Sequence, residues 1–170
     1  MKRTIVAALL LAAGVTSVLA PAALAAKRSG GAAMQTVSEH IDVVSQDGKV
    51  LVKMHFDNRS AQPVHVPKVV AEDGELFGKH FELELAGSGE EVPYVGPMVK
   101  RGPFGPADYL PVKPHSKHTS TIDITQAYAF LPGQHTYRLR YAGNYVADIK
   151  QVSSVTPVKS TPVTFTHTGK

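Results

Sequence analysis

The sequence predicts an all-β protein in which antiparallel strands form a two-sheet β-sandwich. Three observations favour this fold class: short runs alternate apolar with polar residues, turn residues separate the runs, and no helical period is sustained beyond residue 36. The chain has 170 residues, 43% of them hydrophobic, which suffices for one modest core. One sandwich domain is therefore expected.

The beginning of the chain predicts a cleavable signal peptide over residues 1–25. Lys2 and Arg3 form a charged start, residues 5–20 are almost continuously apolar, and Ala23-Leu24-Ala25 is a small-x-small site that a signal peptidase accepts. Because about 20 apolar residues are needed to span a membrane, this shorter run favours cleavage over anchoring. We expect an exported protein, either periplasmic or extracellular.

Residues 26–36 are small and aperiodic, which predicts a flexible lead-in before a single β-sandwich domain over residues 37–170. The chain has no cysteine, so an exported protein with this sequence relies on its core without disulfides. Cleavage after Ala25 would remove Lys2 and Arg3 and lower the net charge from +4 to about +2, which is too weak to favour nucleic acid as a partner. No later segment is apolar enough to predict a membrane span.

Six runs with a period of two predict strands that bury one face. Their apolar members are, in chain order, Ile41 and Val43; Val50, Val52, Met54 and Phe56; Phe81, Leu83 and Leu85; Ile122 and Ile124; Tyr137, Leu139 and Tyr141; and Val163 with Phe165. Prolines flank the expected strands more than they interrupt them, which is typical of edge strands and loops.

Turn signals separate these runs at a spacing that suits hairpins. They are Gln46-Asp47-Gly48, residues 57–60, Asp73-Gly74, Gly87-Ser88-Gly89, Pro132-Gly133 and Ala142-Gly143-Asn144. Thr125 is placed to cap a single helical turn. The polar residues 150–162 are expected to form a long connection.

Tyr137 narrows the fold class to an immunoglobulin-like antiparallel two-sheet β-sandwich. It follows the tight turn at Pro132-Gly133, near the start of a late strand. Immunoglobulin-like domains often place a corner tyrosine there, with its hydroxyl bonded to backbone a few residues upstream. We expect such a buried hydrogen bond at Tyr137.

The segment from Tyr94 to Pro114 has the most distinctive pattern, because proline-containing turns separate short apolar pieces around a basic pair. With residues 73–78, 123–128 and 132–141, it resembles, in order and content, the non-catalytic N-terminal domain of secreted deuterolysin-like zinc metallopeptidases, including peptidyl-Lys endopeptidases. The resemblance implies a propeptide-like β-sandwich that accompanies a peptidase. It also implies a secreted zinc metallopeptidase as partner.

The zinc site that those peptidases need is missing from this sequence. Such a site has two histidines one helical turn apart, a glutamate beside the first as general base, and an aspartate as third ligand. The chain contains no His-Glu-x-x-His. We therefore expect no enzymatic activity, no cofactor and no metal ligand.

Two weaker signals, each a pair of residues, have simpler structural interpretations. His115 and His118 could chelate zinc weakly from a loop, but no carboxylate is near them in sequence, and exposed turn histidines are the simpler account. His80 and Glu82 share one face of a predicted strand, where a metal or acid–base role is the less favoured interpretation.

Two short motifs that could indicate catalysis or glycosylation are more simply explained as turns. Gly87-Ser88-Gly89 lacks the spacing of a nucleophile elbow, so we interpret it as a hairpin tip. Asn58-Arg59-Ser60 is a glycosylation sequon that matters only in a glycosylating host, and a β-turn is the simpler account.

Lys100 and Arg101 are the charged residues that we connect with function, and with Tyr94 they form the candidate partner-binding set. Gly96-Pro97 and Gly102-Pro103 flank the basic pair and would fix its backbone. A rigidly presented basic pair suits an acidic patch on a partner or offers a lysyl bond to a protease. The simpler alternative, which we favour, is a solvated loop. In it the side chains of Tyr94, Val95, Met98 and Val99 pack beneath the basic pair.

Two functional hypotheses follow from the sequence. The first is a non-catalytic module that binds, inhibits or assists a secreted metallopeptidase. The second is an independent immunoglobulin-like structural or adhesive protein of the envelope, in which the shared sequence reflects fold alone.

Overall fold

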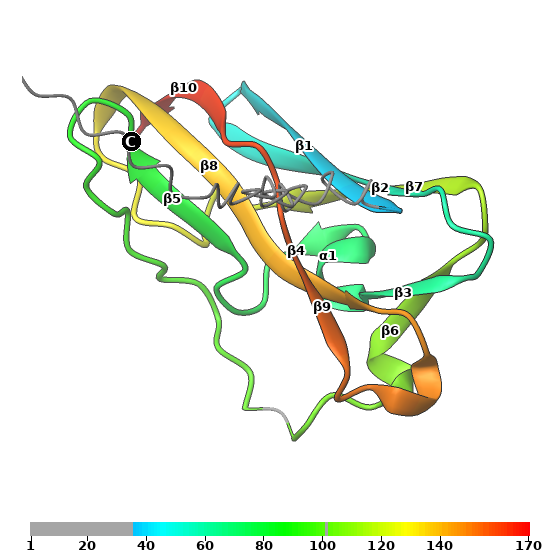
Figure 1. The fold of residues 1–170 in the computed structure, drawn as a ribbon. Coiled ribbons are helices and arrows are strands. Elements are labelled where there is room, and N and C mark those ends of the chain that lie inside the picture. The colour runs from blue at the N-terminus through cyan, green and yellow to red at the C-terminus, as the bar shows by residue number, and fades with distance from the viewer. Residues whose placement is uncertain (1–35, 101) are drawn as a thin grey trace, which may run out of the picture. The chain divides into compact units, whose positions relative to one another are not determined.

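The computed structural model describes residues 36–100 and 102–170, and these residues form an all-β fold with two sheets (Figure 1). The predicted signal peptide, and the predicted lead-in except for its last residue, lie outside the described residues. The first strand begins at Val37, where the folded part of the chain was expected to begin.

The first sheet joins an N-terminal hairpin to a strand from the middle of the chain. In sheet order its strands are β1 (Val37–Gln46), β2 (Lys49–Asn58), β7 (Ser116–Asp123) and the short β4 (Gly74–Glu75), which pairs parallel to β7. Asp47 and Gly48 close the hairpin with φ angles of 53° and 74°. Two positive φ angles are what a two-residue hairpin turn of the favoured hand requires, so the predicted turn is confirmed.

The second sheet is built around β8 (Gly133–Val146), which is the longest described strand. The main strand order is β10 (Val163–Gly169), β8, β3 (Val64–Pro67) and β6 (Tyr109–Val112), while β5 (Phe81–Leu85) and β9 (Val155–Lys159) also pair with β8. The helical pieces that the structure describes are α1 (Lys68–Ala71) and the 3-10 turns η1 (Pro106–Asp108) and η2 (Ile149–Gln151). No longer helix interrupts these strands in the described part of the chain.

Side chains from both sheets meet in one apolar cluster. The alternation predicted from sequence holds along the whole of β2, where every second side chain is buried. In β5 it holds for Phe81 and Leu83, and in β8 for Tyr137, Leu139 and Tyr141, with exposed or partly exposed side chains between them. The cluster includes Ile41, Val52, Met54 and Phe56 from the first sheet, and Phe81, Leu83, Tyr137, Leu139 and Tyr141 from the second.

The prediction of a turn at Ala142-Gly143-Asn144 is wrong, because β8 continues to Val146. Gly143 serves a close approach and not a turn. A Cβ at this position would lie 2.0 Å from the hydroxyl oxygen of Tyr141, so only glycine leaves room for the Tyr141 ring to lie along its own strand.

Residues 150–162 also differ from the predicted long connection, since they contain β9 and part of η2. Only Val158 of β9 is buried, and Pro157 lies in the middle of the strand. An edge strand with one buried residue shows no alternation in sequence. The pairing with β8 arises from tertiary context alone.

The turn after β2 is held by the side chain of Asn58, which is completely buried. Its Nδ2 lies 2.9 to 3.0 Å from the carbonyl oxygens of Gln62, Val112 and Lys113, and its Oδ1 accepts from the N–H of Ser60 at 3.0 Å. The sequon therefore lies where β2 ends and the chain bends, and the Asn58 side chain holds that bend. Thr125 caps no helix: its Oγ1 accepts from the N–H of Val50 at 2.9 Å and holds a hydrogen-bonded turn.

Tyr137 lies at the start of β8 and is completely buried. Its hydroxyl accepts a hydrogen bond of 3.0 Å from the N–H of Leu131, six residues upstream. Its ring packs edge-on against Phe130 and stacks on Phe165. The predicted buried hydrogen bond is thereby confirmed.

Glu39 is an acidic residue on the inner face of β1, between the buried Val37 and Ile41. Its Oε1 is buried and has no hydrogen-bond partner among the described residues. Burial raises the pKa of this carboxyl to about 7. The pKa of Tyr141 on the facing sheet is also raised, mainly by burial and secondly by the charge of Glu39. An inward-pointing carboxyl on an edge strand discourages edge-to-edge pairing with another chain.

Replacing Tyr137 by Phe removes the acceptor of the Leu131 N–H and keeps the ring. We expect the free energy of unfolding to fall by about 1 kcal/mol, as measured by chemical denaturation. Tyr145→Phe is the matched control, because its hydroxyl makes no hydrogen bond within the described residues. Equal stability of the Tyr137→Phe variant and the parent would contradict a structural role for the hydroxyl.

The Glu39→Gln substitution tests the buried carboxyl through the pH dependence of stability. The pKa of Glu39 is about 7 in the folded protein against 4.5 for the free side chain, so the folded state binds the proton more tightly. Stability from this group is present below pH 4.5 and is lost as the pH rises towards 7.

Denaturation curves at pH 5 and pH 8 measure this contribution directly. Between them the parent should lose roughly 1 to 3 kcal/mol more than the Glu39→Gln variant. Glu90→Gln, at an exposed hairpin position, is the control and should keep the parental slope. An unchanged slope in Glu39→Gln would show that this carboxyl titrates normally in the folded protein.

Candidate interaction surface

Tyr94 anchors the segment that carries the candidate basic pair. Its hydroxyl accepts from the N–H of Gly78 at 2.8 Å and lies 2.8 Å from the carbonyl oxygen of Pro97, to which it donates. Its ring packs edge-on against Tyr128, with centroids 5.5 Å apart. Tyr94 is therefore half-buried and engaged inside the protein, which makes it a support of the loop more than a contact surface.

Backbone hydrogen bonds fix the chain on both sides of Tyr94. The N–H groups of Val95 and Gly96 both donate to the carbonyl oxygen of Ala127, at 2.8 and 3.1 Å. A Cβ on Gly96 would lie 2.7 Å from the Tyr94 hydroxyl and 3.0 Å from the Cα of Ala127. Glycine is thus required here for the chain to pass between these two neighbours.

The far end of the segment is held by Asp108. Its carboxylate accepts from the N–H of Gly105 at 2.8 Å, and this contact closes η1 before β6 begins. The ring of Phe104 lies against that of Tyr109, with centroids 5.9 Å apart. The described residues on either side of Arg101, 98–100 and 102–104, therefore lie between two anchored points.

Apolar side chains of this segment face solvent, although the simpler interpretation of the sequence placed them beneath the basic pair. The exposed fractions are 60% for Val95, 75% for Met98 and 52% for Val99. The predicted packing is therefore wrong for these three residues. Gly96 and Pro97 break the alternation that would return one face of the segment to the core.

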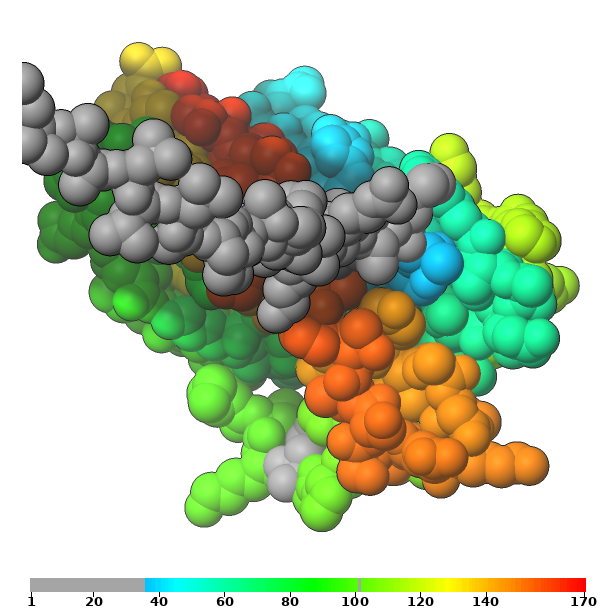
Figure 2. Space-filling model, in the orientation of Figure 1, coloured from blue at the N-terminus to red at the C-terminus, as the bar shows by residue number. Residues whose placement is uncertain are grey.

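Lys100 is exposed next to these apolar side chains, and Phe104 is 39% exposed. We call Val95, Met98, Val99, Lys100 and Phe104 the loop surface. The third candidate residue, Arg101, lies outside the described residues. The light green segment that follows β5 projects away from the strands in Figure 1 and stands out from the body in Figure 2.

Sequence reasoning singled out the basic residues of this segment and missed the exposure of its apolar ones. The available signal was the density of Gly and Pro between residues 96 and 106. So many breakers prevent a strand or helix that could bury the intervening side chains. A contiguous patch of exposed apolar residues on a protein surface often marks an interaction site.

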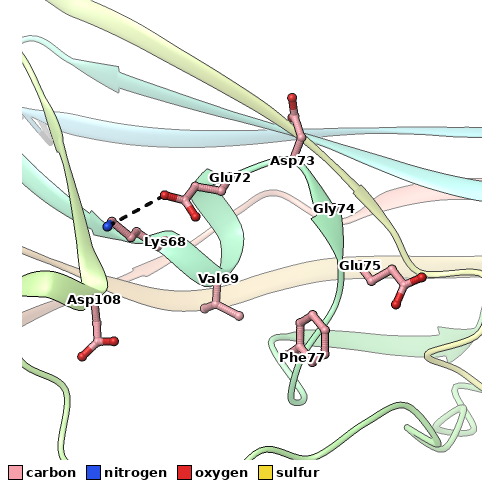
Figure 3. Close-up of a pocket in the computed structure, with 8 residues that line it drawn as sticks. All are labelled: Lys68, Val69, Glu72, Asp73, Gly74, Glu75, Phe77 and Asp108. Carbon is pink, nitrogen blue, oxygen red and sulfur yellow. Dashed lines mark ion pairs between the residues drawn. The ribbon is translucent and has the colours of Figure 1, made fainter.

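A cleft of about 310 Å³ lies between α1, β4 and η1, and is lined by four carboxylates, Lys68, Val69, Gly74 and Phe77 (Figure 3). Three of the carboxylates are already engaged by other residues of the protein. Glu72 lies 4.0 Å from Lys68, Asp73 accepts from the N–H of Thr121 at 2.6 Å, and Asp108 holds Gly105. The carboxylates do not converge on a common centre, since Asp73 points away from the Lys68–Glu72 pair (Figure 3).

The histidines that the sequence singled out lie in different local structures and make different contacts. His115 is an exposed turn residue with a φ angle of 51°, as expected. The same expectation is wrong for His118, which lies partly buried on β7 and donates from Nε2 to the carbonyl oxygen of Ala71 at 2.6 Å. His80 precedes β5, and its Nε2 lies 3.2 Å from the carbonyl oxygen of Phe77. In the described residues, no group of three or more His, Cys, Asp or Glu side chains is arranged to hold a metal ion.

Glu82 belongs to a charged ladder on the outer face of the second sheet. Its carboxylate accepts from Nε of Arg140 at 2.9 Å, and this hydrogen bond lowers the pKa of Glu82. Arg138 and Glu84 form the next pair across the same two strands, at 2.9 Å. Exposed pairs of this kind contribute little to stability and leave Glu82 ionised.

Together, the fold and the surface define an all-β protein of two sheets with a two-point-anchored apolar loop beside a lysine. Comparison with protein-family models and with curated proteins finds no match for this chain. Among the described residues no helix is long and apolar enough to cross a membrane.

Tyr94→Phe should loosen the loop anchor without unfolding the protein. The Gly78 N–H loses its shorter hydrogen bond and keeps only the 3.1 Å bond to Pro97. A loss of about 1 kcal/mol corresponds to roughly fivefold faster exchange of the Gly78 amide hydrogen. The Asp108 amide, bonded to the Gly105 carbonyl, should be unaffected. If the Gly78 amide exchanges at the parental rate, the hydroxyl does not hold the loop.

Proposed function

We propose that this chain is an exported, non-catalytic β-sandwich module that binds a partner protein through the loop surface. The observation that carries the proposal is the exposure of Val95, Met98 and Val99 on a segment whose ends are anchored. Apolar side chains in this number are costly to leave in water unless a partner covers them.

The composition and anchoring of the loop surface suit a protein partner. Methionine and aromatic residues are enriched in the centres of protein interfaces, and a basic residue at the rim selects an acidic counterpart. Anchoring at Tyr94 and Asp108 limits the conformations that the loop would lose on binding. The basic pair predicted from sequence is then the polar part of an otherwise apolar contact.

A secreted zinc metallopeptidase of the deuterolysin-like kind is the partner that we propose. The support is the resemblance of residues 94–114, and of the segments that accompany them, to the non-catalytic N-terminal domain of such enzymes. In this proposal the module binds, inhibits or assists the peptidase and has no catalytic site of its own. The features of residues 1–25 support export to the same compartment.

An immunoglobulin-like structural or adhesive module of the envelope is the second candidate. Its support is the strand order β1-β2-β7-β4 in one sheet and β10-β8-β3-β6 in the other, which matches much of the immunoglobulin arrangement. The corner position of Tyr137 agrees with it. The parallel pairing of β4 with β7 departs from that arrangement.

Polar replacement of the loop surface tests the proposed contact. The purified protein is titrated into a deuterolysin-like peptidase, with binding measured by calorimetry and inhibition by peptide cleavage. The double variant Met98→Gln/Val99→Thr should bind about tenfold more weakly or worse, because buried apolar contacts are lost. Lys100→Ala and Arg101→Ala should each weaken binding less.

The matched control is Val44→Thr, which changes an exposed apolar residue of β1 outside the loop. It should bind like the parent. Equal affinity of parent and loop variants would show that the contact lies elsewhere. If the parent neither binds nor slows the peptidase, the accessory-module proposal is wrong, and self-association of the protein would then favour the adhesive candidate.

A further inference from the structure

Met98 is the exposed methionine of the residues that the structure describes. The chain has four methionines and neither cysteine nor tryptophan, so methionine sulfur is its most readily oxidised side-chain group. Met54 is completely buried, whereas Met98 is 75% exposed on the loop surface. Met1 and Met34 lie outside the described residues. An oxidant dissolved in water therefore meets the sulfur of Met98 before that of Met54.

The fold holds Met98 on the outside of the protein. The carbonyl oxygen of Pro97, the preceding residue, accepts from the hydroxyl of Tyr94 at 2.8 Å and from the N–H of Gly78 at 3.1 Å. These two hydrogen bonds fix the backbone immediately before Met98. Val99, the following residue, is also more than half exposed. The oxidant can therefore reach this part of the loop without any unfolding of the protein.

We propose that Met98 is a reversible oxidation site, and that its sulfoxide form weakens binding through the loop surface. The oxidant is a peroxide. The thioether sulfur takes one oxygen atom from H₂O₂, the O–O bond breaks, and the products are the sulfoxide and water, so the sulfur loses the two electrons that the peroxide gains. Methionine sulfoxide reductases reverse the step. Two electrons come from a pair of thiols, which becomes a disulfide, and the oxygen leaves as water.

Oxidation changes the most exposed member of the loop surface. A thioether is apolar and adapts its shape to a partner, whereas the sulfoxide is polar and adds a hydrogen-bond acceptor. Burying that oxygen against a partner without a donor costs free energy. The aliphatic side chains of Val95 and Val99 do not react with peroxide. The effect on binding, which rests on the proposed function, is therefore that of one polar substitution within an apolar contact.

Met54 provides an internal reference for the oxidation of Met98. It lies on β2 and belongs to the apolar cluster between the sheets. Peroxide reaches its sulfur only when the protein opens, so its oxidation rate reports unfolding. The ratio of the two oxidation rates measures how selective the site is in the folded protein.

Peptide mapping by mass spectrometry tests the oxidation site without a partner. The full chain is treated with H₂O₂ at neutral pH, and the addition of one oxygen atom is followed at each methionine. We expect Met98 to react at least about tenfold faster than Met54. The oxidised protein should also elute earlier in hydrophobic interaction chromatography. Met98→Leu keeps an apolar side chain of similar size and should lack the part of this shift that Met98 causes.

Calorimetric titration into the peptidase proposed above tests the consequence for binding. The parent oxidised at Met98 should bind about tenfold more weakly or worse. Methionine sulfoxide reductases of both stereospecificities, with dithiothreitol, should restore the affinity. Whatever its own affinity, Met98→Leu should bind equally before and after peroxide treatment, which controls for oxidation at the other methionines.

Two results would overturn the proposal. One is oxidation of Met98 no faster than that of Met54, and the other is an unchanged affinity of protein that is fully oxidised at Met98. A reduced parent that does not bind the peptidase would contradict the proposed function instead. In that case peptide mapping and chromatography still decide whether Met98 is the oxidation site and whether its oxidation makes the loop surface more polar.

Discussion

Strand β8 carries the hydrogen bonding on which the second sheet depends. Its N-terminal half lies between β10 and β5, and its C-terminal half pairs with β9 and meets β3 at Val146. Four strands are therefore held by one. The Tyr141 ring occupies the space that a Cβ at position 143 would need. Gly143 therefore lets the strand continue past this ring. Ser160 lies opposite Tyr141, between β9 and β10. Its Oγ accepts from the N–H of Tyr141, and its own N–H donates to the carbonyl oxygen of Tyr141.

The same strand positions the loop surface through a short series of contacts. β8 pairs with β5, and Leu83 of β5 accepts from the N–H of Val92. Tyr128 donates to the carbonyl oxygen of Phe81 and gives Tyr94 a ring to pack against. Each step uses a buried or half-buried group, so the place where the chain leaves the fold is defined even though the side chains beyond it face solvent. The loop surface therefore depends on the core without belonging to it.

The sequence predicted those parts of the fold that depend on the pattern of neighbouring residues. The β1–β2 hairpin, the alternation at Phe81–Leu83 and Tyr137–Tyr141, and the upstream hydrogen bond of Tyr137 follow from period, turn residues and one aromatic position. β9 could not be predicted, because its place depends on pairing with β8 and only Val158 is buried. Gly143 was misread as a turn for a related reason: a glycine that admits a neighbouring ring has the same sequence signal as one that turns the chain.

The candidate sites show the same division. Gly and Pro around residues 96–103 predicted a braced loop with Lys100, but only the three-dimensional arrangement shows that Met98 and Val99 face solvent. The hydrogen bonds of Asp42 with His40 and His55 correspond to no sequence motif, because these residues on β1 and β2 meet through cross-strand register. A two-residue hairpin turn fixes that register, so the turn at Asp47-Gly48 determines which histidine lies opposite His40. A one-residue slip would turn His55 to the other face of the sheet and separate it from Asp42.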